Sequence, residues 1–406
     1  MRDDWLDSDT GHRIVRISRI PGESQSFYFH QNAFTSSGDK MVFANTSTNH
    51  SRDFFVYDWR TQKIERLTHG GTNRGEIVAP ISRRLFYMRD NIVYATHLDT
   101  HLTKQIAELP RGWRGLTVNA DETLLAGAFG QGADEISRGQ PRSYWFKAIQ
   151  EAKLPHILFT LEIATGKTNV IHRGNDWFNH IQFSPTDPSL LMFCHEGPWQ
   201  LVDRIWNIRT DGSGLRLMHE RTVTNEIAGH EFWSHDGKTV WFDLQIPRGQ
   251  KFYLAGVAAD GTGAREVPAR SGNDNAASRD FSRSDQAEIR YSIERDQWSV
   301  HFNISHDGKL FAGDGGAPNM VAHAPNGKWL WLFTPQPDKS LKAEHLVNMS
   351  KHDYSLEPNV VFTPDGKWIV FRGNFDGSPQ VYAVEVAKSG TVARNPNSAA
   401  KNSKSE

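Results

Sequence analysis

Short apolar stretches alternate with polar turns along nearly the whole chain, and one two-part unit recurs seven times. In its first half, two apolar stretches flank a turn, clearly so at residues 34–43, 233–242, 304–311 and 362–371. Three of these turns contain Asp-Gly, a pair that favours the backbone of tight hairpin turns, so each first half predicts two antiparallel strands. Weaker copies at residues 81–86, 118–125 and 183–191 complete the seven.

The second half of the unit is a further strand, turn and strand, as at residues 54–67, 156–172 and 203–218. Two hairpins in each unit make a four-stranded blade. Unit lengths of about 40 to 70 residues are typical of propeller blades that carry loop insertions. We therefore predict an all-β fold, a seven-bladed β-propeller of four-stranded antiparallel blades.

The last unit predicts how the ring closes. Its second half, residues 380–386, lacks a final strand, whereas residues 9–17 near the N-terminus have the turn and strand that are missing. We expect this N-terminal strand to complete the last blade, because closure protects sheet edges that an open array would expose.

The repeat fills nearly all of the 406 residues, so we predict one propeller domain over residues 1–388. Residues 134–154 interrupt it with a segment of helical composition, which we expect to lie over one end of the ring, where it can roof a site. Residues 389–406 contain few large apolar side chains and predict a disordered tail.

A second insertion, residues 271–295, is polar and long for a loop, which is typical of a functional or a mobile segment. Its arginines are more typical of a solvated loop than of an anion clamp; they are Arg279, Arg283, Arg290 and Arg295.

Composition sets limits on partners and location. The 46 Lys and Arg residues nearly balance the 47 Asp and Glu residues, so no overall field draws the chain to nucleic acid or a membrane. No apolar run is long enough to span a bilayer. Cys194 is the one cysteine, which excludes an intramolecular disulfide, and the N-terminus lacks a secretory signal, so we predict a cytoplasmic protein. Oligomeric state stays open.

Known catalytic motifs are absent from the sequence. It contains no Gly-rich phosphate loop, no cysteine spacing for zinc and no Gly-x-Ser-x-Gly elbow. This disfavours nucleotide hydrolysis, zinc-cysteine sites and a serine hydrolase with that elbow.

The densest polar cluster runs from residue 180 to residue 230. His195 and Glu196 end one strand, Arg204 opens the next, and His230 and Glu231 open the following blade. A single histidine at a strand end is more often structural than functional. The repeated His-Glu pair favours function here, whereas His235 and His306 belong to the hairpin turns and are interpreted as structural.

These residues carry a family resemblance. The stretch Phe-Cys-His-Glu-Gly-Pro-Trp at 193–199, followed by Asp-Arg-Ile-Trp at 203–206 and His-Glu-Phe-Trp at 230–233, resembles the oligogalacturonate lyases, seven-bladed propeller polysaccharide lyases. The resemblance implies β-elimination on a 4-linked uronate. His230 would be the base that removes the C5 proton, and Arg204 would engage the carboxylate or the developing charge. Residues lining the same mouth would be His180, His195 and Glu196.

The resemblance also implies a divalent metal, with manganese favoured over magnesium or calcium. His301 falls where the family has one metal-binding histidine. Where the family has a glutamine and a His-Pro-His, this chain has Tyr354, Glu357 and Asn359. Glutamate and asparagine oxygens suit such metals, so His301, Glu357 and Asn359 are the candidate ligands. Alternatively the metal is lost, arginine neutralises the carboxylate, and Tyr354 in the substrate site protonates the leaving oxygen.

The sequence thus predicts a lyase acting on short oligogalacturonides such as unsaturated digalacturonate, with an oligouronide as its partner. Three alternatives stay open at this point. One is a lyase for a different uronide, and another is a non-catalytic propeller that binds a protein as a scaffold. The third is the propeller gate of a hydrolase that has lost its catalytic domain.

Overall fold

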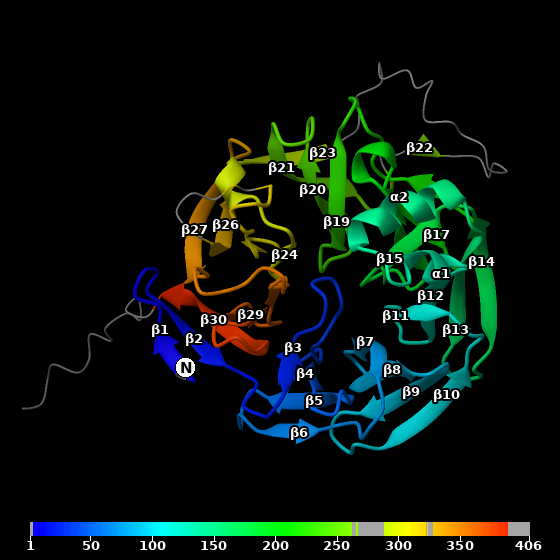
Figure 1. Ribbon diagram of the computed structural model, residues 1–406, viewed down its shortest axis with the longest axis horizontal. Coiled ribbons are helices and arrows are strands. Elements are labelled where there is room, and N and C mark those ends of the chain that lie inside the picture. The colour runs from blue at the N-terminus through cyan, green and yellow to red at the C-terminus, as the bar shows by residue number, and fades with distance from the viewer. Residues whose placement is uncertain (1–2, 262–264, 267–287, 322, 324–327, 389–406) are drawn as a thin grey trace, which may run out of the picture.

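The computed structural model describes residues 3–261, 265–266, 288–321, 323 and 328–388, and these form seven antiparallel sheets around one axis (Figure 1). The predicted seven-bladed propeller is therefore confirmed. The first strands of neighbouring blades contact one another, β7 with β11, β11 with β15 and β24 with β28, so they line the axis.

The blades follow the chain in order. Blade 1 contains β3 (Glu23–Gln25), β4 (Lys40–Thr46), β5 (Arg52–Asp58) and β6 (Ile64–Arg66). Blade 2 contains β7 (Asn73–Ala79), β8 (Arg84–Arg89), β9 (Ile92–His97) and β10 (Thr103–Glu108). Blade 3 contains β11 (Arg114–Val118), β12 (Leu124–Gly130), β13 (His156–Glu162) and β14 (Thr168–Gly174). Blade 4 contains β15 (Trp177–Phe183), β16 (Leu190–Glu196), β17 (Ile205–Arg209) and β18 (Arg216–Leu217), with β22 (Arg265–Glu266) as a fifth strand. Blade 5 contains β19 (Ile227–Trp233), β20 (Thr239–Gln245), β21 (Phe252–Ala258) and β23 (Glu288–Ile293). Blade 6 is β24 (Phe302–Ile304), β25 (Phe311–Gly313), β26 (Trp329–Pro335) and β27 (Leu341–Asn348).

Blade 7 joins the two ends of the described chain. It contains β28 (Val361–Phe362), β29 (Trp368–Gly373) and β30 (Gln380–Lys388), and β2 (His12–Arg16) pairs with β30 as its fourth strand. The predicted closure is confirmed, and β1 (Asp4–Leu6) adds a fifth strand on the outer edge. Figure 1 shows the blue β2 beside the red β30.

Two ends of the ring must be distinguished. The first strand of each blade begins at one end, which we call the site mouth, and reaches its hairpin turn at the other end, the turn mouth. Because the strands are antiparallel, the second strand of each blade returns to the site mouth. Short segments after these second strands are therefore placed around the axis at the site mouth.

The predicted helical insertion is one such segment. It forms α1 (Ala133–Ser137) and α2 (Arg142–Ala152) after β12, with Pro141 directly before α2, where a missing N–H costs nothing. Figure 1 shows both helices in front of blades 3 and 4.

The predicted polar loop 271–295 is shorter than we expected. Residues 288–293 form β23, the outer strand of blade 5, because Ile289, Tyr291 and Ile293 alternate with polar residues in the pattern of a strand. Arg290 lies in this strand and pairs with Glu288 at 2.6 Å. Arg295 lies in the short 3-10 helix Arg295–Gln297. Arg279 and Arg283 lie outside the described residues, as does the predicted tail 389–406.

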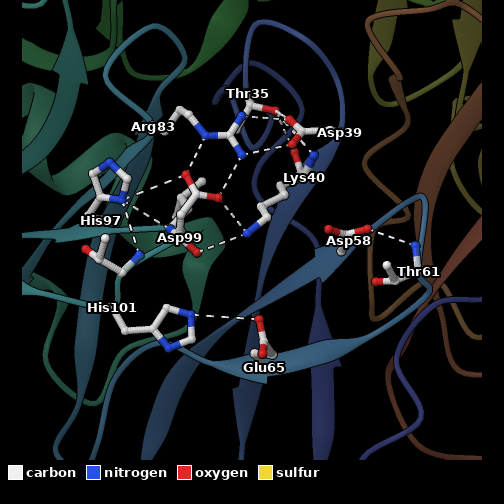
Figure 2. Close-up of polar contacts among 12 residues, drawn as sticks. Thr35, Asp39, Lys40, Asp58, Thr61, Glu65, Arg83, His97, Asp99 and His101 are labelled. Carbon is white, nitrogen blue, oxygen red and sulfur yellow. Dashed lines mark hydrogen bonds and ion pairs between the residues drawn. The ribbon is translucent and has the colours of Figure 1, made fainter.

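Ion pairs join blades 1 and 2 at the turn mouth (Figure 2). Arg83, in the first turn of blade 2, binds Asp39 of blade 1 at 2.8 Å and Asp99 of its own blade at 2.6 Å. Lys40 binds Asp99 at 2.7 Å. Hydrogen bonds from Arg83 hold the pKa of Asp39 well below its usual range. This network ties neighbouring blades together, and it lies at the opposite end of the ring from the candidate site.

A buried histidine between two carboxylates predicts a stability effect. His219 Nε2 lies 2.7 Å from Glu226 and Nδ1 lies 3.2 Å from Glu288, and all three side chains are buried. Burial alone would lower the pKa of His219, but the two carboxylates outweigh it and raise the pKa to about 9. We expect His219→Gln to lower the free energy of unfolding at pH 7 by roughly 3 kcal/mol, because Glu226 loses its cation and Glu288 keeps only Arg290. Urea denaturation measures this.

The pH dependence tests the same triad. The folded pKa of His219 lies above its ordinary value, so its stabilisation is complete below about pH 6.5 and is lost as pH rises through about 9. Wild type should lose stability between pH 7 and 10, and His219→Gln should lose less over that range. The exposed His69→Gln is the control and should follow wild type; equal pH profiles for all three proteins would contradict the assignment.

None of the described helices is long and apolar enough to cross a bilayer.

Candidate active site

The two central histidines sit at equivalent breaks in the innermost strands. The pairing register shifts after Asn179 in blade 4 and after Gly229 in blade 5, and the next residues, His180 and His230, both have a φ of 48°. The same bulge position holds Gly75 in blade 2 and Gly115 in blade 3. A positive φ suits glycine and costs a histidine about 1 kcal/mol or more, so two histidines there indicate strain kept at a functional site.

His230 is held by a carboxylate from the same blade. Its Nδ1 lies 3.1 Å from Asp243 Oδ1, and Asp243 is fully buried on β20, opposite Gly229. An Nδ1–H that donates to Asp243 leaves the Nε2 lone pair free to accept a proton. Trp199 lies edge-on to the His230 ring at 5.2 Å. Asp243 was missed at the sequence level, although its place opposite the bulge in a repeated blade could have indicated it.

Arg204 is the centre of a buried charge cluster. Its Nε donates to Glu231 at 2.8 Å, its Nη1 donates to Glu196 at 2.6 Å, and its Nη2 lies 3.3 Å from His180 Nδ1. Only 1 % of its side chain is exposed. Two carboxylates and a histidine therefore engage Arg204, whereas we had expected its guanidinium to face a substrate carboxylate. Glu196, which also accepts a hydrogen bond from Trp199 Nε1 at 3.0 Å, is likewise engaged.

The cluster fixes the His180 ring. Its Nδ1 lies 3.2 Å from Glu231 Oε1 as well as near Arg204. Burial acts to raise the pKa of Glu231, but Arg204 and His180 outweigh it and hold that pKa well below its usual value. With Nδ1 held by protein groups, Nε2 is the nitrogen of His180 left for a ligand.

His301 has the same support as His230. Its Nδ1 lies 2.7 Å from Asp314 Oδ2, and Asp314 also accepts the backbone N–H groups of His301 and Asn359. Burial raises the pKa of Asp314 to about 7. The His301 Nε2 lies 3.1 Å from the Tyr28 hydroxyl and 3.8 Å from Glu357 Oε2. The His301 and His230 rings are 4.7 Å apart.

The segment 28–30 of blade 1 completes this aromatic cluster and was also missed. Tyr28 contacts the rings of His180 at 5.5 Å and His301 at 5.1 Å, and His30 contacts His180 at 5.3 Å. Burial lowers the pKa of His30 well below its ordinary value, so its ring is neutral. These residues lie before the first clear hairpin, and nothing in their local pattern indicates that they reach blades 4 and 6.

Two predicted site residues, His195 and Tyr354, point away from this cluster. His195 lies on the opposite face of β16 from Glu196, stacked on Trp206 at 4.7 Å, because neighbouring residues of a strand point to opposite faces. Tyr354 is buried behind the site, where its hydroxyl donates to the backbone carbonyl of Asp314 at 2.6 Å.

Asn359 is close to the site but turned away from it. Its Oδ1 accepts the Phe29 backbone N–H at 3.0 Å, and its Nδ2 donates to the Glu357 carbonyl at 3.0 Å. It has a φ of 54° and binds Asp314 through its backbone. Asn359 therefore acts as a brace between blades 1 and 7, which leaves His301 and Glu357 from the predicted metal set.

A cavity of about 570 Å³ opens beside this cluster. Its walls come from the axis, from blades 3 and 4, and from α1 and α2; lining residues that matter below are Tyr28, Arg114, Trp145, His156, His180 and Glu357. The helical insertion therefore does roof a cavity at the site mouth. His180 lines the cavity, whereas His230 does not. The centres of the two rings are 6.3 Å apart.

Comparison with known proteins identifies the family of this chain. The family model described as oligogalacturonate lyase matches residues 3–258, well over half of the chain. The chain belongs to the oligogalacturonate lyase family. Its members are lyases that act on oligosaccharides, and the resemblance noted from residues 193–233 is confirmed.

Individual relatives align with nearly the whole length of this lyase. The chain is 26 % identical to the oligogalacturonate lyase of Dickeya dadantii, over 95 % of this chain and 96 % of that one. The oligogalacturonide lyase of Pectobacterium atrosepticum is equally similar, with the same coverage. A solved oligogalacturonate lyase in complex with manganese has a TM-score of 0.77 and 24 % identity, over 95 % of this chain and 96 % of that chain, and it has the same fold.

His301 and Glu357 can be compared with the ligands that usually hold a divalent metal. A histidine whose Nδ1 donates to a buried carboxylate is the usual arrangement of a metal ligand, and His301 with Asp314 has it. Glu357 supplies an oxygen 3.8 Å from His301 Nε2, a spacing that two ligands of one ion can have. His301 and Glu357 therefore fit a divalent metal, and its remaining positions would be left to substrate oxygens and water, as is common for magnesium and manganese.

A second group of possible ligands is occupied. Among the described residues, His180, Cys194 and Glu231 have ligand atoms within 4.8 Å of one another. The Arg204 guanidinium already contacts His180 and Glu231, so a positive charge fills that place. The cluster fits a buried ion-pair network and not a metal centre.

Proposed function

We propose that this lyase cleaves short oligogalacturonides, digalacturonate and its unsaturated form above all, by β-elimination with His230 as the base. The observation that carries this proposal is the His230–Asp243 pair, held at a strained bulge beside a cavity of suitable size for a disaccharide. Asp243 would keep the proton on Nδ1 and so keep Nε2 ready to accept the C5 proton.

The remaining residues have distinct proposed roles. The C5 proton goes to His230, the electrons of the C5–H bond form the C4=C5 double bond, and the C4–O4 bond breaks with its electron pair on O4, which takes up a proton from water. His180, which lines the cavity and is fixed through Nδ1, would contact the departing O4 through Nε2. Arg204 would act through His180 and Glu231, which it positions, and its charge keeps Glu231 ionised. His195 and Tyr354 are left out of this proposal because the His195 ring stacks on Trp206 and the Tyr354 hydroxyl donates to the Asp314 carbonyl, away from the central histidines.

The charge of the site supports a divalent cation, with manganese the first choice and magnesium or calcium as alternatives. Glu196, Glu231 and Glu357 outnumber the guanidinium groups of Arg204 and of Arg372, which lies beside Glu357, so an anionic substrate meets a site with excess negative charge. A bound metal supplies the positive charge that neutralises the substrate carboxylate and stabilises the enolate-like anion. His301 and Glu357 would hold it.

Metal removal tests this part. We expect dialysis against EDTA to abolish cleavage of digalacturonate and manganese to restore it. Manganese binding followed by electron paramagnetic resonance should weaken at least tenfold in His301→Ala and in Glu357→Gln, because each removes one of two ligands. Glu344→Gln, an acidic residue outside the site, is the control. Unchanged turnover with EDTA together with no bound manganese would favour a metal-free mechanism.

The substrate is tested with a panel of uronides. Unsaturated products absorb in the ultraviolet, and cleavage of an already unsaturated disaccharide removes that absorbance. We expect digalacturonate to give the highest kcat/KM. Turnover of another uronide alone would change the substrate and retain the chemistry, whereas no turnover of any uronide by a folded protein would favour a binding propeller.

A further inference from the structure

The cavity extends beyond the catalytic cluster into a chamber that no part of the proposed mechanism uses. The chamber lies between α2, blade 3 and blade 4, and we define it by Arg114, Phe129, Trp145, His156 and Trp177. Its other end reaches His180, Tyr28 and Glu357. A ligand that lies at the catalytic cluster can therefore continue under the helical roof.

Aromatic side chains form much of the chamber wall. Trp145 on α2, Trp177 on β15 and Phe129 on β12 supply aromatic surface from three separate elements. Trp145 is fixed by a hydrogen bond from its Nε1 to the Gln140 carbonyl at 2.7 Å. Apolar and aromatic walls with a few placed polar groups are typical of small-molecule sites.

His156 provides a polar atom without a partner. Its side chain is 2 % exposed, its Nδ1 lies 2.9 Å from the Leu154 carbonyl, and its buried Nε2 has no hydrogen-bond partner. Nδ1 must then carry the proton, which leaves Nε2 as an acceptor. Gly130 beside it has no side chain; a Cβ there would lie 2.2 Å from Nε2. A buried acceptor without a partner, on a residue that lines a cavity, favours a hydroxyl donor from a ligand.

Arg114 provides the charge. It stands at the start of β11 and its Nη2 binds Asp134 of α1 at 2.6 Å, with 52 % and 56 % of the two side chains exposed. An exposed pair of this kind contributes little, so a ligand carboxylate can take the guanidinium from Asp134. A bidentate carboxylate is the ligand that arginine recognises best.

We infer that this chamber is the subsite for the second uronate ring, the ring that is not deprotonated. Arg114 binds its carboxylate, Trp145 packs on its ring and His156 accepts one of its hydroxyls. The inference rests on the proposed function, because it takes the first ring to lie at His230. It explains why the helical insertion stands over blades 3 and 4, and it makes the lyase selective for acidic neighbours of the cleaved ring.

The test combines enzyme variants with a change in the substrate. Digalacturonate is compared with the same disaccharide in which the second ring carries a methyl ester. We expect the ester to raise KM about tenfold in wild type, Arg114→Gln to raise KM for the diacid about tenfold, and the ester to have little further effect in Arg114→Gln. Trp145→Ala should raise KM for both substrates. The control is Arg13→Gln, which breaks an equally exposed Arg–Asp pair in blade 7 and should change nothing.

Binding is measured separately from turnover. In the His230→Ala background, calorimetric titration with digalacturonate should show the same tenfold loss for Arg114→Gln, with equal thermal stability. If Arg114→Gln behaves as Arg13→Gln, or loses the same factor on diacid and ester, the chamber is not a subsite for the second uronate, even though the lyase acts on digalacturonate. If wild type neither binds nor cleaves any uronide, the proposed function fails and this inference with it.

Discussion

Replacing His230 with alanine is expected to lower kcat for digalacturonate cleavage by about 10³-fold, because no other group would take up the C5 proton. KM should change by less than about threefold, since most of the proposed substrate contacts lie in the cavity and not on this ring. Initial rates at saturating substrate, followed by ultraviolet absorbance, measure the effect. His306→Ala, at the turn mouth, serves as the control and should retain wild-type rates.

Asp243→Asn separates a positioning role from a purely structural one. The amide can orient His230 but cannot stabilise its protonated form, so we expect kcat to fall by about 10²-fold. KM for digalacturonate should stay within about threefold of the wild-type value, because Asp243 is not among the residues that line the cavity. Wild-type kcat in a folded Asp243→Asn variant would show that Asp243 only supports the fold, and full activity of His230→Ala would remove His230 from the mechanism.

Replacing Arg204 with methionine is expected to lower the free energy of unfolding at pH 7 by 3–5 kcal/mol, about the cost of leaving a buried charge without its partner. Arg204 is the cation that both Glu196 and Glu231 contact, and all three side chains are buried. Urea denaturation gives the value. Arg209→Met, which breaks an exposed pair with Asp187, should cost less than about 1 kcal/mol.

The pH dependence of this variant should reverse in sign. In the native cluster the pKa of Glu231 is held well below its ordinary value, so its stabilisation is present above about pH 4.5 and is lost as pH falls further. Without Arg204, burial raises the pKa of both carboxylates, so Arg204→Met should gain stability as pH falls from 8 to 5. A variant that is as stable as wild type at both pH values would show that the cluster does not depend on Arg204.

How the proposed site works depends on contacts that the order of residues does not show. Arg204 was expected to face the substrate, yet Glu196 and Glu231 surround it. The sequence places Glu196 eight residues before Arg204 and Glu231 twenty-seven residues after it. Only the packing of blade 4 against blade 5 brings the three together and places Arg204 between two buried carboxylates.

The sequence by itself determined the architecture, because strand and turn patterns are local and repeat. Asp-Gly turns, alternating apolar residues and the unpaired end of the last blade were enough to predict seven blades and their closure by β2. The two His-Glu pairs and the residues around them also indicated the family, and that resemblance assigned His180 and His230 to one mouth of the ring.

The tertiary structure decided which side chains meet. Asp243 and Asp314 lie across a strand pair from their histidines, and Tyr28 reaches blades 4 and 6 from blade 1, so strand pairing and blade packing set these contacts. Strand alternation turned His195 away, and hydrogen bonds to Phe29 and Asp314 removed Asn359 and Tyr354 from the site. A propeller collects its site from one end of several blades, and that convergence exists only once the ring has closed.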